Sequence, residues 1–148
     1  MSETYVPSPS EQVRNQVARY EASNGADGGT LEGKPVVILT TTGARTGAVR
    51  KNPVMRIPYG DKYIAVASAA GAATDPAWYR NLTAHPDLWV QDGAVKRQLR
   101  ACEVFGEEKT RMWAVAEQYW PHFPEYRAKA GDREIPVLVL EPVGHEET

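Results

Sequence analysis

Apolar residues near the N-terminus recur at the spacing of a helix. Val13, Val17 and Tyr20 lie three or four residues apart, and this spacing places them on one helix face. The sequence SPSE at residues 8–11 precedes them and is a capping-box pattern with proline at the first helical position. We therefore predict one amphipathic helix over residues 9–22.

A polar stretch, SNGADGGTLEGK, follows this helix. Its glycines leave the backbone free to sample many conformations, so the stretch is typical of a flexible connector. We expect residues 1–30 to form an N-terminal segment and residues 31–148 the main domain. The helix of this segment either moves to cover or leave a pocket or simply packs on the barrel, and the sequence favours neither alternative.

Strand patterns joined by turn signals fill most of the remaining chain. They occupy residues 34–41, 49–60, 61–69, 87–92, 94–105 and 133–142. The first is continuously apolar and β-branched, which is typical of a buried strand. The dipeptide Asp92-Gly93 between two of these patterns is a strong hairpin signal.

Helical patterns are fewer and interrupt the strands only twice. Asp75-Pro76 starts a short helix that ends before Pro86, and a longer pattern runs over residues 107–120. Hairpins dominate, and the long helices that alternate with parallel strands are missing. We predict a mainly β fold, an antiparallel six-stranded barrel with peripheral helices.

Composition and charge limit the classes of function. The chain has 148 residues, of which 42% are hydrophobic and 24% charged, as in ordinary globular domains. It has no apolar run of the roughly 20 residues that a membrane span needs, so we expect a cytoplasmic protein, with the N-terminal helix as a candidate contact to the inner face of the membrane. The net charge of −2 argues against nucleic-acid binding.

Metal and thiol chemistry have little support in the sequence. Cys102 is the single cysteine, and the histidines His85, His122 and His145 are far apart. These spacings match no metal-binding motif. We predict no metal site and interpret Cys102 as a small apolar side chain within a strand.

The stretch TTTGARTGAVRKNP at residues 40–53 concentrates cations and glycines. Arg45, Arg50 and Lys51 lie in it, and residues 33–58 contain no acid. Threonine hydroxyls and freed backbone N–H groups beside such cations can bind a phosphate or carboxylate. The alternative is a hairpin whose cations are solvated.

Two further stretches suggest the walls of a pocket. Small residues around Ser68 leave room for a flat ligand, although a flexible loop explains them equally well. Trp120, Phe123 and Tyr126 are spaced three residues apart among prolines and could form an aromatic wall for a planar substrate or pack as core.

Three segments together resemble a known family. GKPVVILTTTGARTGAVRKNPV, ASAAGAATDPAWYRNL and WPHFPEYRAKAGDREIPVLVLEP occur in this order over about residues 30–142, and are similar to the deazaflavin-dependent nitroreductases of actinobacteria. The resemblance implies an FMN-binding-like split β-barrel and binding of coenzyme F420, an 8-hydroxy-5-deazaflavin with a phosphate and an oligoglutamate tail. It also implies hydride transfer from the reduced cofactor to quinones, nitroaromatics or activated alkenes such as unsaturated lactones and coumarins.

The resemblance also implies roles for individual residues. Those expected to contact the cofactor are Thr42, Gly43, Ala44, Arg45, Thr46, Arg50, Lys51, Asn52, Pro53, Ala67, Ser68, Ala69, Trp78, Tyr79 and Asn81. Trp120, Phe123 and Tyr126 are expected to contact the acceptor. Because the cofactor carries the hydride chemistry, the protein is expected mainly to bind and orient, with a hydroxyl of Tyr126 or Ser68 as the proton donor.

Other functions remain open from the sequence. The same barrel could carry FMN, which also joins a planar ring to a phosphate, or could serve as a non-catalytic carrier of the deazaflavin or of a fatty acid. The expected partner is a small-molecule electron acceptor, and the expected assembly is a monomer or a homodimer.

Overall fold

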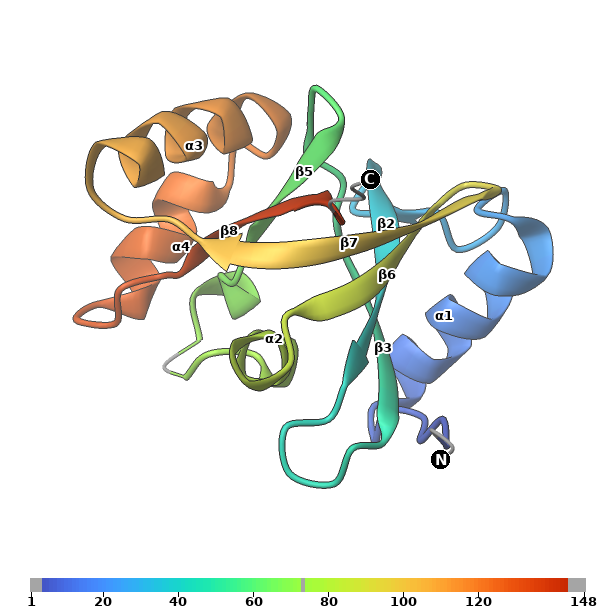
Figure 1. The fold of residues 1–148 in the computed structure, drawn as a ribbon. Helices are drawn as coiled ribbons and strands as arrows, with labels where there is room; N and C mark the ends of the chain where they lie inside the picture. Colours follow the sequence, from blue (N-terminus) through green and yellow to red (C-terminus); the bar gives the residue numbers. More distant parts are fainter. Residues whose placement is uncertain (1–3, 73, 144–148) are drawn as a thin grey trace.

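The computed structural model describes residues 4–72 and 74–143, and is built around one mixed-length antiparallel sheet (Figure 1). Residues 1–3, Ala73 and residues 144–148 lie outside the described residues. They belong to the start of the predicted N-terminal segment and to the predicted main domain. The strands are β1 (Thr30–Leu31), β2 (Lys34–Thr42), β3 (Val49–Met55), β4 (Pro58–Tyr59), β5 (Lys62–Val66), β6 (Asp87–Asp92), β7 (Val95–Glu103) and β8 (Val137–Pro142). The helices are α1 (Glu11–Ser23), the 3₁₀ turn η1 (Ala69–Gly71), α2 (Ala77–Ala84), α3 (Gly106–Tyr119) and α4 (Phe123–Ala130).

The strand order is β1-β2-β6-β7-β8-β5-β4, with β3 paired to β2 outside this path. Every pairing between these strands is antiparallel. The predicted mainly β fold with peripheral helices is therefore confirmed. The predicted six strands correspond to the six longer ones, and β1 and β4 are additional two-residue strands.

The predicted hairpin turn and helix break are present, and the first helix begins at Glu11, two residues later than predicted, with Ser10 as its cap. Gly93 has a φ of 64° between β6 and β7, as expected for the Asp-Gly hairpin. Ser10 caps α1 by accepting a hydrogen bond from the Val13 N–H (3.3 Å). The prolines after residue 120 end the long helix: α3 stops at Tyr119 and α4 begins anew at Phe123, because proline cannot donate the backbone bond of a continuing helix.

The helices cover the sheet at different places (Figure 1). Helices α3 and α4 lie at one end, where Met112, Trp113, Phe123 and Val137 belong to one buried apolar cluster. Helix α1 lies at the other end. Among the described residues no helix combines the length and apolarity that crossing a membrane requires.

Helix α1 packs on the sheet, as in the second of the two alternatives that the sequence left open. Its residues Val17 and Tyr20 are 1% and 2% exposed and pack with Val36 and Ile38 of β2. The Tyr20 hydroxyl donates to the Gln91 carbonyl (3.2 Å) and accepts from the Gly93 N–H (2.7 Å). The apolar face that was the candidate membrane contact is thus buried against the sheet.

The glycine-rich connector is also held by hydrogen bonds. The Gln16 side-chain amide donates to the carbonyls of Gly28 (2.9 Å) and Thr30 (3.0 Å), and the Val36 N–H donates to the Gly29 carbonyl (3.0 Å). Two glycines are required here by the shape of the backbone. Gly28 has a φ of 73°, and a side chain at Gly29 would meet the Gly25 carbonyl. The bond from Val36 to Gly29 crosses the predicted boundary at residue 30.

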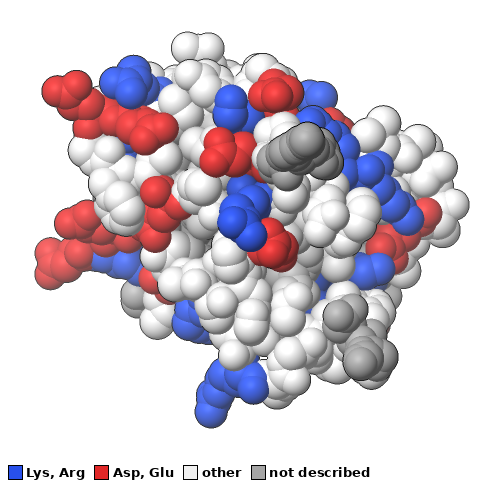
Figure 2. All heavy atoms as spheres, viewed as in Figure 1, with Lys and Arg blue, Asp and Glu red and all other residues white. Residues whose placement is uncertain are grey.

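The face shown in Figure 2 carries lysine and arginine interspersed with aspartate and glutamate. Several cations on the molecule are paired with acids, for example Arg56 with Asp92 and Arg100 with Asp87. Charges of both signs on one face are what the small net charge of −2 leads one to expect. A surface region that contains several arginines and no acidic residue would therefore differ from this mixed distribution of charge.

Candidate functional site

A groove lined by arginines opens between the turn after β2, strand β3 and helix α2. Its volume is about 440 Å³. It is lined by Ser8, Pro9, Gly43, Ala44, Arg45, Thr46, Arg50, Asn52, Ala77, Arg80 and Asn81. Three of these residues are arginines and none is acidic. Because arginine stays charged and presents a planar fork of N–H donors, the groove suits a phosphate or carboxylate.

The turn after β2 is fixed by Asn81, a buried residue of α2. Its carboxamide oxygen accepts from the Ala44 N–H (2.9 Å), and its nitrogen donates to Thr41 Oγ1 (3.1 Å). Across the turn, the Gly43 N–H donates to the Ala48 carbonyl (2.7 Å). The fold therefore sets the shape of this wall of the groove without help from a ligand.

Strand alternation divides the three consecutive residues 50–52 between two sides of β3. Arg50 and Asn52 line the groove. Lys51 points the other way: its Nζ lies 2.6 Å from Glu21 Oε2 of α1 and 4.8 Å from the centre of the Tyr5 ring. The structure therefore places Lys51 outside the groove, because successive side chains of a strand point to opposite faces.

Three other predicted contacts line neither this groove nor the cavity that contains Trp78 and Ser68. Thr42 lines a separate depression that includes Asp87. Ala67 is fully buried. Tyr79 lies on a different face of α2 from the cavity-lining Trp78, and its hydroxyl donates to Glu103 (2.6 Å); burial and this carboxylate raise the pKa of Tyr79 to about 12. A phenol held neutral in this way is a structural contact.

A second space is an apolar cavity of about 250 Å³. It is lined by Leu31, Glu32, Pro53, Val54, Met55, Val66, Ser68, Ala69, Trp78, Trp120, Phe123 and Tyr126. The groove and the cavity are lined from the same two elements, because β3 contributes Asn52 to the groove and Pro53 to the cavity, and α2 contributes Ala77 to the groove and Trp78 to the cavity.

The predicted aromatic wall is present in the cavity, and two of its members are also core. Trp120 and Phe123 are 2% and 1% exposed and belong to the apolar cluster under α3 and α4. Tyr126 is partly buried and packs edge-to-face on Phe123, with ring centres 6.2 Å apart. Within the described residues its hydroxyl has no hydrogen-bond partner, which leaves it available to a ligand.

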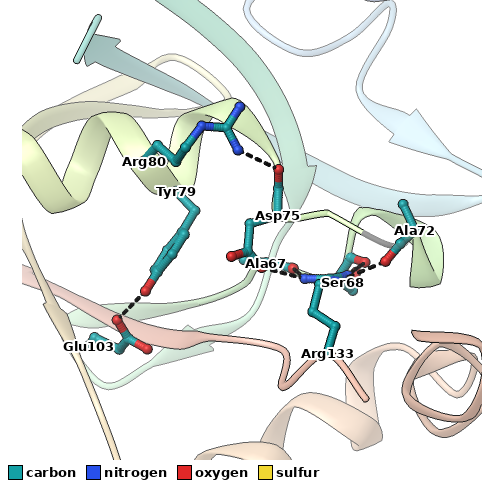
Figure 3. A network of polar contacts seen from close by, with 8 residues as sticks. All are labelled: Ala67, Ser68, Ala72, Asp75, Tyr79, Arg80, Glu103 and Arg133. Carbon is teal, nitrogen blue, oxygen red and sulfur yellow. Dashed lines mark hydrogen bonds and ion pairs between the residues drawn. The ribbon is translucent and has the colours of Figure 1, made fainter. Parts of the chain in front are cut away.

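The opposite wall is the small-residue segment around Ser68, which is 8% exposed. Its backbone is held by Arg133, whose guanidinium donates to the carbonyls of Ala67 (3.1 Å), Ser68 (2.6 Å) and Ala72 (2.8 Å) (Figure 3). Arg133 also pairs with Asp75 at 2.5 Å. The motif DREIPVLVLEP contains this arginine, but nothing in its spacing revealed which carbonyls it would meet.

Two more charged residues of the site were missed from the sequence. Arg80 lines the groove one helical turn after Ala77, which the predicted helix could have revealed by its periodicity. Glu32 lines the cavity from the tight turn between β1 and β2, where its φ is 50° and that of Gly33 is 80°. Glu32 is the one ionisable carboxylate or cation among the described residues that line this cavity.

The described side chains that line the groove and the cavity are suited to binding a ligand, and they include no pair of groups arranged for general acid–base catalysis. Ser68 and Tyr126 supply hydroxyls in the cavity, and arginines supply positive charge in the groove. Among residues 4–72 and 74–143, no group of His, Cys, Asp and Glu is arranged to hold a metal ion. Such a site suits a reaction whose chemistry a bound organic cofactor provides.

Comparisons with other proteins agree with this geometry. A family model described as F420H(2)-dependent quinone reductase matches residues 12–142. An F420H(2)-dependent quinone reductase of Mycobacterium tuberculosis is 33% identical over 132 residues, which are 86% of this chain and 88% of that protein. A solved structure described as an F420-H2 dependent reductase (FDR-A) has 42% identity and a TM-score of 0.67, covering 72% of this chain and 94% of its own. Another, described as a domain-swapped dimer, has 40% identity and a TM-score of 0.70, covering 90% of this chain and 100% of its own. The family model spans most of the sequence, and the chain therefore belongs to the F420H(2)-dependent quinone reductase family.

Proposed function

We propose that this protein is an oxidoreductase that holds reduced coenzyme F420 across the arginine groove and the apolar cavity and reduces quinones. The observation that carries the proposal is that β3 and α2 line both spaces, one with three arginines and no acidic lining residue, the other predominantly apolar. Coenzyme F420 has matching parts, a phosphate with an acidic tail and a flat ring.

The groove residues bind the anionic part. Arg45 comes from the turn after β2, Arg50 from β3 and Arg80 from α2, so charge reaches the ligand from three elements. Charge-assisted hydrogen bonds from arginine to phosphate or carboxylate are roughly twice as strong as neutral ones. Because Asn81 already holds the turn after β2 in place, less conformational entropy is lost when a ligand binds there.

The cavity residues orient the reacting partners. Trp78, Ser68 and Ala69 line the side expected for the ring, and Phe123 and Tyr126 line the side expected for the acceptor. When bound, the reduced cofactor supplies the hydride. The protein excludes water from an apolar space, and the Tyr126 hydroxyl donates a hydrogen bond or a proton to the acceptor oxygen as negative charge develops there.

The acceptor range follows from the shape and polarity of the cavity. Apolar and aromatic walls favour flat, electron-poor molecules. We extend the proposal from quinones to nitroaromatics and to activated alkenes such as unsaturated lactones, all of which accept a hydride into a planar conjugated system. A bulky acceptor is disfavoured, because Trp120 and Phe123 are fixed by core packing and cannot swing aside.

A reconstitution experiment tests the proposal. The purified protein is titrated with F420 and separately with FMN while tryptophan fluorescence is followed, since Trp78 and Trp120 line the cavity. Turnover of a naphthoquinone is then measured with each reduced cofactor. We expect saturable F420 binding that weakens with salt, and turnover with reduced F420. Tighter binding of FMN, or F420 binding without turnover of any acceptor, would overturn the proposal in favour of a flavin enzyme or a carrier.

For the assembly we propose a homodimer. A solved structure 40% identical to this chain is described as a domain-swapped dimer. Trp89 on β6 is 49% exposed, which is unusual for a tryptophan on a sheet face unless another surface covers it. Light scattering on the purified protein decides: a mass near twice the 16.3 kDa of the chain supports the dimer, and a monomer mass contradicts it.

A further inference from the structure

Arg133 makes an unusual set of contacts for an arginine in a loop. Its side chain is 10% exposed, and its donors reach the carbonyls of Ala67, Ser68 and Ala72 as well as the carboxylate of Asp75 (Figure 3). Buried arginines need such partners, because an unpaired charge away from water is strongly unfavourable. One guanidinium thus gathers four acceptors from a single nine-residue segment, residues 67–75.

The gathered segment has an irregular backbone that the sheet does not support. Ala69 has a φ of 48° and Gly71 of 81°. Within the segment, the Gly71 N–H donates to the Ser68 carbonyl (2.8 Å) and the Ala72 N–H to the Ala69 carbonyl (3.0 Å). Positive φ at a non-glycine residue persists only where the surroundings enforce it. Among the described residues, Arg133 holds this segment from a distance together with the Pro136 carbonyl, which accepts a hydrogen bond from the Ala67 N–H (2.9 Å).

The position of Arg133 in the chain joins the two walls of the cavity. It follows α4, which carries Phe123 and Tyr126, and it holds the segment that carries Ser68. The walls touch nearby as well: a Cβ at Gly71 would lie 2.9 Å from the Tyr126 carbonyl and from Lys129. The guanidinium of Arg133 and the close packing of Gly71 on α4 are thus two contacts that hold the Ser68 segment beside the α4 wall.

We propose that Arg133 is a positioning residue for hydride transfer, which sets the separation of the Ser68 wall from the α4 wall without touching either reactant. This inference rests on the proposed function. Hydride transfer requires the donor and acceptor carbons to approach closely, and a misplacement of about 1 Å can lower a rate by on the order of 10²-fold. A purely structural ion pair would change stability but leave the rate of the folded protein unaltered.

The test compares Arg133→Met with Arg133→Lys and with a control that loses stability elsewhere. Methionine keeps apolar length but removes every donor. Lysine keeps the charge but loses the planar fork that reaches several carbonyls. The control is Ile38→Val or Ile38→Ala, whichever matches the melting temperature of Arg133→Met, because Ile38 is buried under α1 and lines neither the groove nor the cavity.

Two measurements are made on each variant. Amide hydrogen exchange of residues 67–75 in the protein without cofactor reports the clamp directly. The single-turnover rate at saturating cofactor and saturating naphthoquinone reports the hydride step. For Arg133→Met we expect exchange at Gly71 and Ala72 to rise and the rate to fall by at least about tenfold. We expect Arg133→Lys to be intermediate and the matched control to resemble the parent in both.

The outcomes separate this proposal from the function on which it rests. If Arg133→Met keeps the parent's exchange in residues 67–75, or if the matched control loses as much rate, the positioning role is wrong. If the parent itself turns over no acceptor, the proposed function fails, while the exchange data still decide whether the clamp exists. Should Arg133→Met not fold, Asp75→Ala weakens the clamp from its other side, and parent-like exchange and rate in that variant overturn the proposal.

Discussion

Replacing Arg50 and Lys51 one at a time separates direct contact from general charge. Both substitutions to alanine remove one positive charge, and the two residues are adjacent on β3. Arg50 lines the groove, whereas Lys51 pairs with Glu21 on the other side of the strand. We predict that Arg50→Ala weakens F420 binding strongly and that Lys51→Ala leaves it nearly unchanged.

The expected size follows from the contacts. A hydrogen bond to a charged group contributes about 1.5–3 kcal/mol, and each 1.4 kcal/mol corresponds to about tenfold in the dissociation constant. Because the groove is open to water and Arg45 and Arg80 remain, we expect the lower part of this range, about 10- to 30-fold. Lys51→Ala instead removes a partly exposed ion pair, which lowers the free energy of unfolding by at most about 1 kcal/mol.

The assay is a fluorescence titration with F420 at low and high salt, together with thermal unfolding of both variants. The affinity of the parent should fall steeply with salt, and that of Arg50→Ala less steeply, because the variant has one fewer charged contact to screen. Equal weakening by both substitutions would refute the reasoning, since the effect would then depend on net charge and not on which face of β3 a side chain occupies.

Three further predictions concern single side chains. Tyr126→Phe should lower turnover with quinones by about 10²-fold, the low end for a lost general acid, while F420 affinity stays the same; steady-state kinetics and titration decide, and unchanged kinetics would remove Tyr126 from the site. Glu32→Gln should lower the KM for a sulfonated naphthoquinone a few-fold relative to a neutral one, because two like charges a few ångströms apart in water repel by about 1 kcal/mol; an equal effect on both acceptors would exclude charge selection at the cavity. Tyr79 keeps its proton in the folded state to a pKa of about 12, against 10.0 when unfolded, so its contribution to stability is present below about pH 10 and is lost as the pH rises toward 12. Tyr79→Phe should therefore show a smaller fall in melting temperature across this alkaline range, and an identical fall would contradict the assignment.

Local signals in the sequence predicted most of the fold. The Asp92-Gly93 hairpin and the proline break after Tyr119 each depend on neighbouring residues, and both are confirmed. The capping box over residues 8–11 predicted the first helix, but the cap is Ser10 and the helix begins at Glu11. The resemblance to a deazaflavin-dependent family is confirmed by the family model, and with it the reductase class and the cofactor.

The parts that sequence reasoning missed depend on contacts distant in the chain. The direction of Lys51 is set by Glu21, 30 residues away, and the packing of α1 by the bond from Tyr20 to Gln91 across 71 residues. Arg133 meets carbonyls more than 60 residues earlier. Composition predicted a cationic turn, and strand alternation alone places Arg50 and Lys51 on opposite faces, but the pairing of β3 with β2 determines which of these faces meets the groove.

The most direct test of the account compares F420 with the same deazaflavin lacking the phosphate and the glutamate tail. Both contain the ring that the apolar cavity would hold, and only the first has anions for Arg45, Arg50 and Arg80. We predict that the truncated cofactor binds at least about 10²-fold more weakly, as expected for the loss of two or more charge-assisted contacts, and that its affinity hardly changes with salt. Equal affinity for the two compounds, with the same salt dependence, would contradict the assignment of the arginine groove to the anionic part of the cofactor.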